Sequence, residues 1–257
     1  MFRKAFLAVA VGGCAVVVVT TAAARPAATT AAKVCKGTVT LGMMAPITGP
    51  AASIGGDQLH WAQFFATQWN KTHKLKLAIV QGDTQLDPSK ASVVAQQFAS
   101  NKKIVGVIGP AGSQEVVATS PVLKRAGFAY VSGSATKVSL TDGSNKGYFF
   151  RVVPNDGVQG PTDADYMVKK LGVGSGSSVM IIDDQESYST GLADIVQAAL
   201  KAKGVNVDRE SIDQKATDFS SLVAKVGSST KVVFAPFQLA SQAQLLAQQL
   251  KAQGKSA

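Results

Sequence analysis

Short apolar segments alternate with longer amphipathic ones along the chain from Lys36 onward. The short segments are rich in valine, isoleucine and leucine and suit buried strands, whereas the longer ones repeat apolar residues with the period of a helix. This alternation predicts an α/β fold in which helices flank parallel sheets. The expected strands are residues 37–46, 75–83, 103–109, 128–135, 148–154, 177–184, 205–210 and 231–237.

Helices are expected between these strands. Asp87 followed by Pro88 supplies a side-chain acceptor and a residue that suits the first helical position, so a helix should begin there. In the helix expected over 55–71, one face carries Leu59, Ala62, Phe65 and Trp69. That apolar face predicts packing on a sheet. The other expected helices are 89–101, one starting at 113, 160–172, 189–204, 218–229 and 239–254.

The alternation forms two series of similar length that meet between Arg151 and Gly157. Each series is long enough to form its own layered unit. We therefore expect an N-terminal α/β lobe over 37–154 and a second α/β lobe over 155–257, both Rossmann-like.

The first residues have the pattern of a secretory signal, with Arg3 and Lys4 before an apolar run and small residues after it. We expect a signal peptide over 1–24, a flexible segment over 25–36, and an exported protein, periplasmic or on the cell surface. Two alternatives stay open: a lipid anchor through Cys14, and an uncleaved membrane anchor.

Composition narrows the class of partner. Once the signal is removed Cys35 is the single cysteine, which excludes an intramolecular disulfide and a cysteine metal cluster. The formal net charge is +10, but the lysines are scattered and are not interleaved with aromatic residues as in a nucleic-acid groove. We expect no nucleic-acid partner and a monomer.

The glycines Gly106, Gly109 and Gly112 only partly resemble a dinucleotide-binding loop. Such a loop follows the first strand and is paired with an acid at the end of the next one, whereas these glycines follow the third strand. The chain also lacks the Gly-Lys-Ser/Thr of a phosphate loop. We expect no nucleotide cofactor.

Catalytic and metal sites are also poorly supported. The two histidines, His60 and His73, lie away from the expected strand ends, and no Gly-x-Ser-x-Gly elbow is present. Asp183, Asp184 and Glu186 could bind a metal, although a hydrogen-bonded loop explains them better. We expect neither an enzyme nor a metal site.

One helix start has the chemistry of an anion site. Ser113 is expected to be the N-cap residue, with the N–H groups of Gln114, Glu115 and Val116 pointing outward. Those donors and the helix dipole favour a carboxylate or phosphate, and residues 134–136 add polar groups nearby. An ordinary capped helix beside an ordinary loop explains these residues equally well, so both interpretations stay open.

Six segments together resemble the substrate-binding proteins of branched-chain amino acid ABC transporters, which bind leucine, isoleucine or valine. They are residues 45–64, 82–98, 105–136, 150–168, 183–200 and 217–226. The resemblance implies the type I periplasmic-binding-protein fold, with two lobes that close over a small amino acid or a related carboxylate or amide. It further implies delivery to a membrane permease and no enzymatic activity or cofactor. A ligand sensor of the same fold, signalling to a membrane receptor or regulatory partner, is the alternative.

The resemblance also assigns ligand-binding positions. It places the ligand carboxylate at Ser113 and Thr136, in a first-lobe wall with Ala111, Gly112, Ser134 and Ala135, and it brings Tyr188 from the second lobe. Two positions depart from the family: Ile54 replaces a frequent aromatic residue, and Gln238 or Leu239 replaces another. Glu115 complements the helix dipole, but if it pointed inward it would repel a carboxylate.

Family members continue well past Gly254, with the acid that receives the ligand's ammonium group and the segments that complete both lobes. The resemblance thus implies that the C-terminal part is missing here. We expect apolar sheet edges and helix-facing surface to be exposed as a result.

Overall fold

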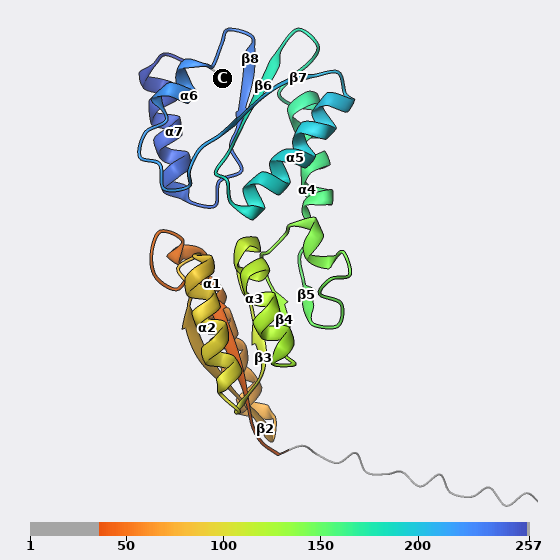
Figure 1. The fold of residues 1–257 in the computed structure, drawn as a ribbon, viewed down its shortest axis with the longest axis vertical. Coiled ribbons are helices and arrows are strands. Elements are labelled where there is room, and N and C mark those ends of the chain that lie inside the picture. The colour runs from red at the N-terminus through yellow and green to blue at the C-terminus, as the bar shows by residue number, and fades with distance from the viewer. Residues whose placement is uncertain (1–35, 256–257) are drawn as a thin grey trace, which may run out of the picture. The chain divides into compact units, whose positions relative to one another are not determined.

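The computed structural model describes residues 36–255, which contain two parallel β-sheets flanked by helices (Figure 1). The first sheet consists of β1 (Gly37–Ala45), β2 (Leu75–Asp83), β3 (Ile104–Ile108), β4 (Ala129–Ser132) and β5 (Phe149–Arg151). The second consists of β6 (Ser178–Asp183), β7 (Asn206–Ser211) and β8 (Thr230–Phe234). The α/β fold with parallel sheets is confirmed, and every expected strand is present. The predictions for the signal peptide, Cys14 and Cys35 lie outside the described residues.

Strand order makes β1 and β6 the points where each sheet changes direction. The first sheet has the order β2-β1-β3-β4-β5 and the second β7-β6-β8, and every neighbouring pair is parallel. In the first sheet, β2 therefore lies on one side of β1 and β3 on the other. In the second sheet, β7 and β8 lie on the two sides of β6. In sheets of this kind, a crevice opens at the carboxyl ends of the two strands on either side of the switch.

The helices begin where local capping chemistry places them. They are α1 (Ala52–Thr72), α2 (Pro88–Ser100), α3 (Ser113–Arg125), α4 (Asp156–Lys169), α5 (Ser187–Ala202), α6 (Ser220–Ala224) and α7 (Ala240–Ala252), with a 3-10 helix over Val138–Thr141. The Asp87 carboxylate accepts hydrogen bonds from the N–H groups of Ser89 and Lys90, as expected for the start of α2. Helix α4 starts four residues before the expected 160, because Asn155 caps it by accepting from the Gly157 N–H at 2.9 Å.

The first sheet is covered on one face by α2 and α3, which pack against each other. Phe98 of α2 lies over the sheet, where a Cβ atom added at Gly42 would stand 2.4 Å from its ring. The absence of a side chain at Gly42 thus lets α2 lie close to β1. The same core includes Met44, Val107, Val116, Leu123, Tyr130 and Phe149.

Helix α1 covers the opposite face, where Met43 of β1 packs with Leu59. Gly55, Leu59 and Ala66 are its buried residues. The prediction that Phe65 faces the sheet is wrong, since Phe65 is 58% exposed. Small residues at 55, 62 and 66 bring the helix close to the sheet, and Phe65 lies instead against Trp69, with ring centroids 5.9 Å apart.

The second sheet alternates its side chains between two helical layers. Val179 and Ile181 point into a core formed with α4 and α5, whereas Met180 and Ile182 pack with α6 and α7. This alternation is the period of two expected for a strand. Because all six residues of β6 are buried, it is the central strand of this sheet by packing as well as by order.

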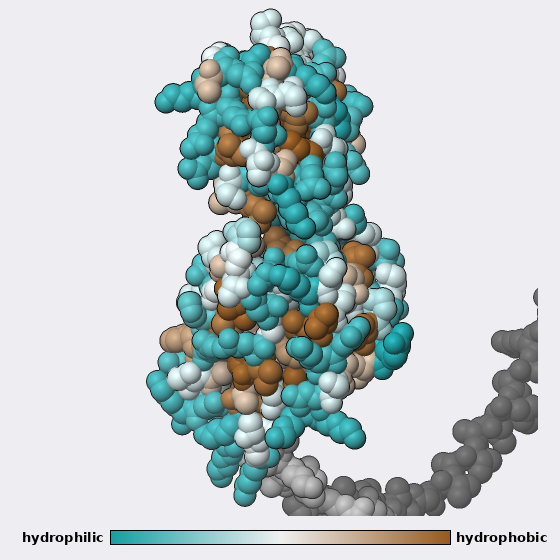
Figure 2. Space-filling view, turned by 60° about the vertical axis from the view of Figure 1, so that its left-hand side comes forward, coloured by the Kyte–Doolittle hydropathy of each residue, from teal (hydrophilic) through white to brown (hydrophobic). Residues whose placement is uncertain are grey.

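Several large apolar side chains are exposed around the first sheet. Trp61, Phe64 and Phe65 on α1 are each more than half exposed. Phe150 of β5 is 48% exposed and is paired with Val131, on the face opposite to Tyr130 and Phe149. Figure 2 shows such apolar groups at the surface among polar ones. Among the described helices, none combines the length and apolar character required to cross a membrane.

The contact between α1 and the loop after β1 gives the first prediction. A Cβ atom added at Gly55 would lie 2.1 Å from the Pro46 carbonyl oxygen, whereas one added at Gly56 meets nothing within 4 Å. We expect Gly55→Ala to lower the free energy of unfolding by about 1–3 kcal/mol through overpacking. Gly56→Ala, the matched control, should raise it by about 0.5–1 kcal/mol through helix propensity. Urea unfolding of both variants checks this, and equal effects would contradict the close packing.

Candidate functional site

A cavity of about 240 Å³ lies where the carboxyl ends of the strands are expected to form crevices. It is lined by Ile54, Leu86, Ala111, Ser134, Thr136, Gln159, Tyr188, Phe237 and Gln238. These residues follow β1, β2, β3 and β4 of the first sheet and β6 and β8 of the second, or lie in the first turns of a helix. Both switch points thus contribute to one cavity, whose described lining contains no charged side chain.

Serine hydroxyls hold the loops after β3 and β4 together. Ser132 donates to the Pro110 carbonyl at 2.6 Å and accepts from the Ala135 N–H at 2.9 Å. Ser134 donates to the Ala111 carbonyl at 2.7 Å. These bonds fix the polar residues after β4 beside the start of α3, where the sequence predicted them to lie.

Arg151 supports the same wall from behind. Its guanidinium donates to the carbonyls of Ala135 at 3.2 Å and Lys137 at 2.8 Å, on either side of Thr136. The Asp156 N–H donates to the Thr136 carbonyl at 3.0 Å. The Thr136 backbone is thereby fixed on both sides, although its hydroxyl has no hydrogen-bond partner among the described residues.

The N-cap of α3 is Gly112, so the prediction that Ser113 caps this helix is wrong. Gly112 has extended backbone angles, and its carbonyl accepts the first helical bond from the Val116 N–H at 3.0 Å. Ser113 is the first helical residue, and its hydroxyl accepts from the Lys137 N–H at 3.2 Å instead of capping the helix. The serine thus adds a third tie between the two loops. Its side chain is buried and does not line the cavity.

Glu115 points back over the helix start and does not line the cavity. Its side chain is fully buried, and its carboxylate accepts from the Gly112 N–H at 2.6 Å. Burial raises the pKa of Glu115 to about 7, partly offset by the Thr84 hydroxyl and the N–H groups of Gly112 and Ala111. Glu115, three residues after the N-cap, makes one half of a capping box, since Gly112 has no side chain to accept the reciprocal bond.

A second buried carboxyl group, Asp156, lies behind Thr136. Neither of its oxygens has a hydrogen-bond partner among the described residues. Burial raises its pKa, opposed by the Thr136 hydroxyl and by the positive charges of Arg151 and Lys137. Burial likewise raises the pKa of Tyr188, beside Gln159. The phenol therefore stays protonated and is available as a donor to a bound molecule.

Two hydrogen bonds join the loops and helix starts of the first sheet to those of the second. The Gln114 amide nitrogen donates to the Gln238 amide oxygen at 2.8 Å. The Lys137 ammonium donates to the Ser187 carbonyl at 3.1 Å. Because Gln238 uses its oxygen on Gln114, its nitrogen remains as the donor toward the cavity.

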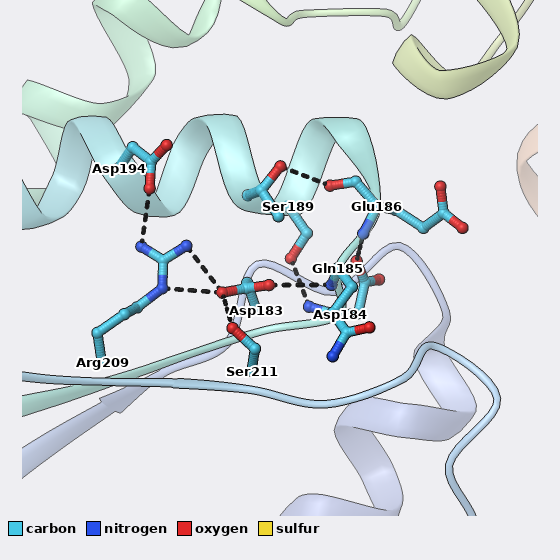
Figure 3. Close-up of polar contacts among 9 residues, drawn as sticks. Asp183, Asp184, Gln185, Glu186, Ser189, Asp194, Arg209 and Ser211 are labelled. Carbon is cyan, nitrogen blue, oxygen red and sulfur yellow. Dashed lines mark hydrogen bonds and ion pairs between the residues drawn. The ribbon is translucent and has the colours of Figure 1, made fainter. Parts of the chain in front are cut away.

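The acids at the end of β6 are engaged in a polar network (Figure 3). Asp183 accepts from the Arg209 guanidinium and from the Ser211 hydroxyl, both within 2.8 Å. Asp184 accepts from the Glu186 N–H at 3.0 Å. A hydrogen-bonded loop, as preferred from the sequence, therefore accounts for these acids. Within residues 36–255 no group of three or more metal-ligating side chains comes together.

Comparison with known proteins identifies the family to which this arrangement belongs. A family model described as "Periplasmic binding protein" matches residues 38–257. The chain belongs to the periplasmic binding protein family.

Curated members of this family include relatives at about 30% identity. An amino acid binding protein from Pseudomonas aeruginosa is 30% identical over 223 residues, which cover 85% of this chain and 59% of the relative. A Leu/Ile/Val-binding protein homolog from Brucella melitensis is 30% identical over 195 residues, covering 74% of this chain and 52% of the relative. The chain spans between half and three fifths of the length of these periplasmic binding protein relatives.

A solved leucine-binding protein from Thermotoga maritima shares the fold. It superposes with a TM-score of 0.77 at 21% identity, over 85% of this chain and 61% of the other. At this identity the likeness bears on the fold alone, and it agrees with two parallel sheets flanked by helices.

Sequence reasoning placed five of its eight site residues in the cavity lining of this periplasmic binding protein. Ile54, Ala111, Ser134, Thr136 and Tyr188 line the cavity, whereas Gly112, Ser113 and Ala135 form the backbone and hydroxyl support behind it. Leu86, Gln159 and Phe237 were missed, and of the pair Gln238 or Leu239 only Gln238 lines it. The family resemblance places an aromatic residue at position 238 or 239. Phe237 supplies an aromatic ring one or two positions earlier.

Glu115 gives a prediction for the pH dependence of stability. Because its folded-state pKa of about 7 exceeds the ordinary glutamate pKa of 4.5, its contribution to stability is fully present below pH 4.5 and is lost as pH rises through 7. Glu115→Gln keeps an acceptor for Gly112 but has no charge. The free energy of unfolding of the variant minus that of the wild type should therefore rise by on the order of 3 kcal/mol between pH 4 and 8. Denaturant titrations across this range measure it, and a constant difference would contradict the buried carboxyl.

Proposed function

We propose that this chain is an extracytoplasmic solute-binding component of an ABC importer, which binds a branched-chain amino acid or a related small carboxylate or amide. The observation that carries the proposal is a cavity lined by residues at the carboxyl ends of both sheets, with no charged side chain in its described lining, in a chain that belongs to the periplasmic binding protein family. Relatives named for amino acid or Leu/Ile/Val binding support this ligand class. They are named as binding proteins, which supports a function other than catalysis.

One wall of the cavity suits a carboxylate. Thr136 and Ser134 line this wall beside the start of α3, whose first-turn N–H groups and dipole attract anions, and the Thr136 hydroxyl has no hydrogen-bond partner among the described residues. Each hydrogen bond to a charged carboxylate contributes about 1.5–3 kcal/mol. Three further residues contribute to this wall by maintaining the geometry of its loops: Gly112, Ser113 and Ala135.

The remaining walls suit a small apolar side chain. Ile54, Leu86 and Phe237 provide apolar surface, while Tyr188, Gln159 and Gln238 supply polar groups. A cavity of about 240 Å³ lies just below the 300–1,000 Å³ typical of drug-sized ligands. The size and mixed lining favour a molecule such as leucine, with an anionic head and an aliphatic tail.

The proposed mechanism is hinge closure between an N-terminal lobe over 37–154 and a second lobe over 155–257. A ligand that contacts Thr136 and Gln238 together joins residues from both lobes. It therefore stabilises the closed form, and the size of this effect is the difference between its binding free energies for the closed and the open forms. The closed monomer would then be recognised by a membrane permease after export, as is usual for a component of an importer.

Ligand binding gives the third prediction. L-leucine, L-isoleucine, L-valine and 4-methylpentanoate are titrated into the chain by calorimetry, and at least one should bind. Thr136→Ala should weaken that binding by about 10- to 100-fold, because a hydrogen bond to a charged group is lost. Thr162→Ala on the exposed side of α4 is the matched control and should have no effect. No binding by any probe, or equal affinities for both variants, would overturn the proposed site.

The contact between Gln114 and Gln238 gives a fourth prediction. We expect Gln114→Ala and Gln238→Ala each to weaken binding of the same probe, because their hydrogen bond holds the two lobes together and orients the Gln238 amide. In a double-mutant cycle the two effects should couple by about 0.5–1.5 kcal/mol. Strictly additive effects on the dissociation constant would show that this bond has no part in ligand capture.

A further inference from the structure

Glu115 lies directly behind the cavity wall yet does not line the cavity. It is 0% exposed, and its carboxylate accepts from the Gly112 N–H at 2.6 Å, next to Ala111 of the lining. A Cβ atom added at Gly112 would lie 3.0 Å from this carboxylate and 2.8 Å from the Leu86 side chain. Glu115 and Gly112 therefore pack directly behind Ala111 and Leu86 of the lining.

The environment of Glu115 is poorly suited to a charge. Its second oxygen, Oε1, is buried without a hydrogen-bond partner among the described residues, and so is the neighbouring Thr84 hydroxyl. The charged group that acts on it is Asp87, at the start of α2, and that charge is also negative. Burial outweighs the polar groups around this carboxylate, and the like charge of Asp87 adds to the cost of ionising it.

We propose that Glu115 is a positioning residue that makes anion binding in the cavity dependent on pH. It holds the Ala111–Gly112 turn in both of its protonation states, but it places a negative charge behind that turn only when it is ionised. This inference rests on the proposed function. It concerns a residue that the ligand does not touch.

The two states of Glu115 act differently on a bound carboxylate. The protonated group accepts the Gly112 N–H and keeps the turn in place without a charge. The ionised group keeps the same bond, but its charge opposes the helix dipole's attraction for anions and repels the ligand's carboxylate. Ligand binding therefore favours protonation of Glu115, and near neutral pH a proton moves from solvent to the Glu115 carboxylate as the anion binds.

The test uses the full chain with L-leucine and 4-methylpentanoate as probes. For the wild type we expect affinity to fall about three- to tenfold between pH 6 and 8.5, an effect of the size expected for a partly screened like charge. Glu115→Gln should keep the low-pH affinity across this range. Glu186→Gln, which removes a carboxylate from a neighbouring cavity, is the matched control and should follow the wild-type profile. A Glu115→Gln profile identical to that of the wild type would overturn the proposal.

Proton uptake provides a measurement that needs no variant. Calorimetry at pH 7 in two buffers of different ionisation enthalpy should show a fraction of a proton taken up per bound anion. Asp156 is a second buried acid near the wall, so Asp156→Asn is measured as well and should retain the uptake. If the wild type takes up no proton on binding, or if Glu115→Gln still takes one up, Glu115 is not the group that is protonated when the anion binds.

Hydrogen exchange of the ligand-free chain separates this proposal from the proposed function. Glu115→Ala removes the acceptor for the Gly112 N–H, so exchange in segment 109–114 should accelerate at least tenfold, whereas Glu115→Gln should leave it unchanged. If neither probe binds, the proposed function fails, but faster exchange in Glu115→Ala still supports the positioning role. Unchanged exchange in Glu115→Ala overturns that role whether or not a probe binds.

Discussion

The hydroxyl groups that tie the loop after β3 to the loop after β4 are the interaction on which the site depends. Ser132, Ser134 and Ser113 bind backbone atoms across the two loops, and Arg151 holds the second loop from behind. Because these bonds use backbone groups that the strands no longer pair, they satisfy buried donors and acceptors while fixing the cavity wall. The hydroxyl of Thr136 has no hydrogen-bond partner among the described residues, and Thr136 lies where these bonds hold the start of α3.

Sheet topology explains why that wall faces a cavity. In both sheets the strand order changes direction at the first strand, so crevices open beside β1 and β6 at the carboxyl ends. The local sequence pattern predicted the strands and the start of α2 at Asp87, because these depend on neighbouring residues. It could not give the strand order, and so it missed Leu86, Gln159 and Phe237, which join the cavity through tertiary packing. Phe65 was misplaced for a related reason, since periodicity alone cannot distinguish adjacent positions at the edge of an apolar face.

Glu115 illustrates a conflict between local and tertiary requirements. Locally it accepts the Gly112 N–H and complements the helix dipole, both of which favour the carboxylate. Tertiary packing buries it beneath Leu86 and beside Asp87, which disfavours the same charge. The outcome is a carboxyl group that titrates near neutrality, next to a wall whose proposed task is to bind an anion. A wall of backbone N–H groups and hydroxyls is sensitive to such a charge because the described cavity lining contains no charged side chain.

The central claim is that the anionic end of the ligand binds between Thr136 and the first turn of α3. The most direct measurement is a crystal structure of the chain with L-leucine or with the probe that binds best. The account predicts the carboxylate within hydrogen-bond distance of the Thr136 hydroxyl and of a first-turn N–H of α3, with the aliphatic tail against Ile54 and Phe237. A ligand found instead in the neighbouring cavity lined by Asp87, Glu186 and Lys215, or with its carboxylate turned away from α3, would contradict it.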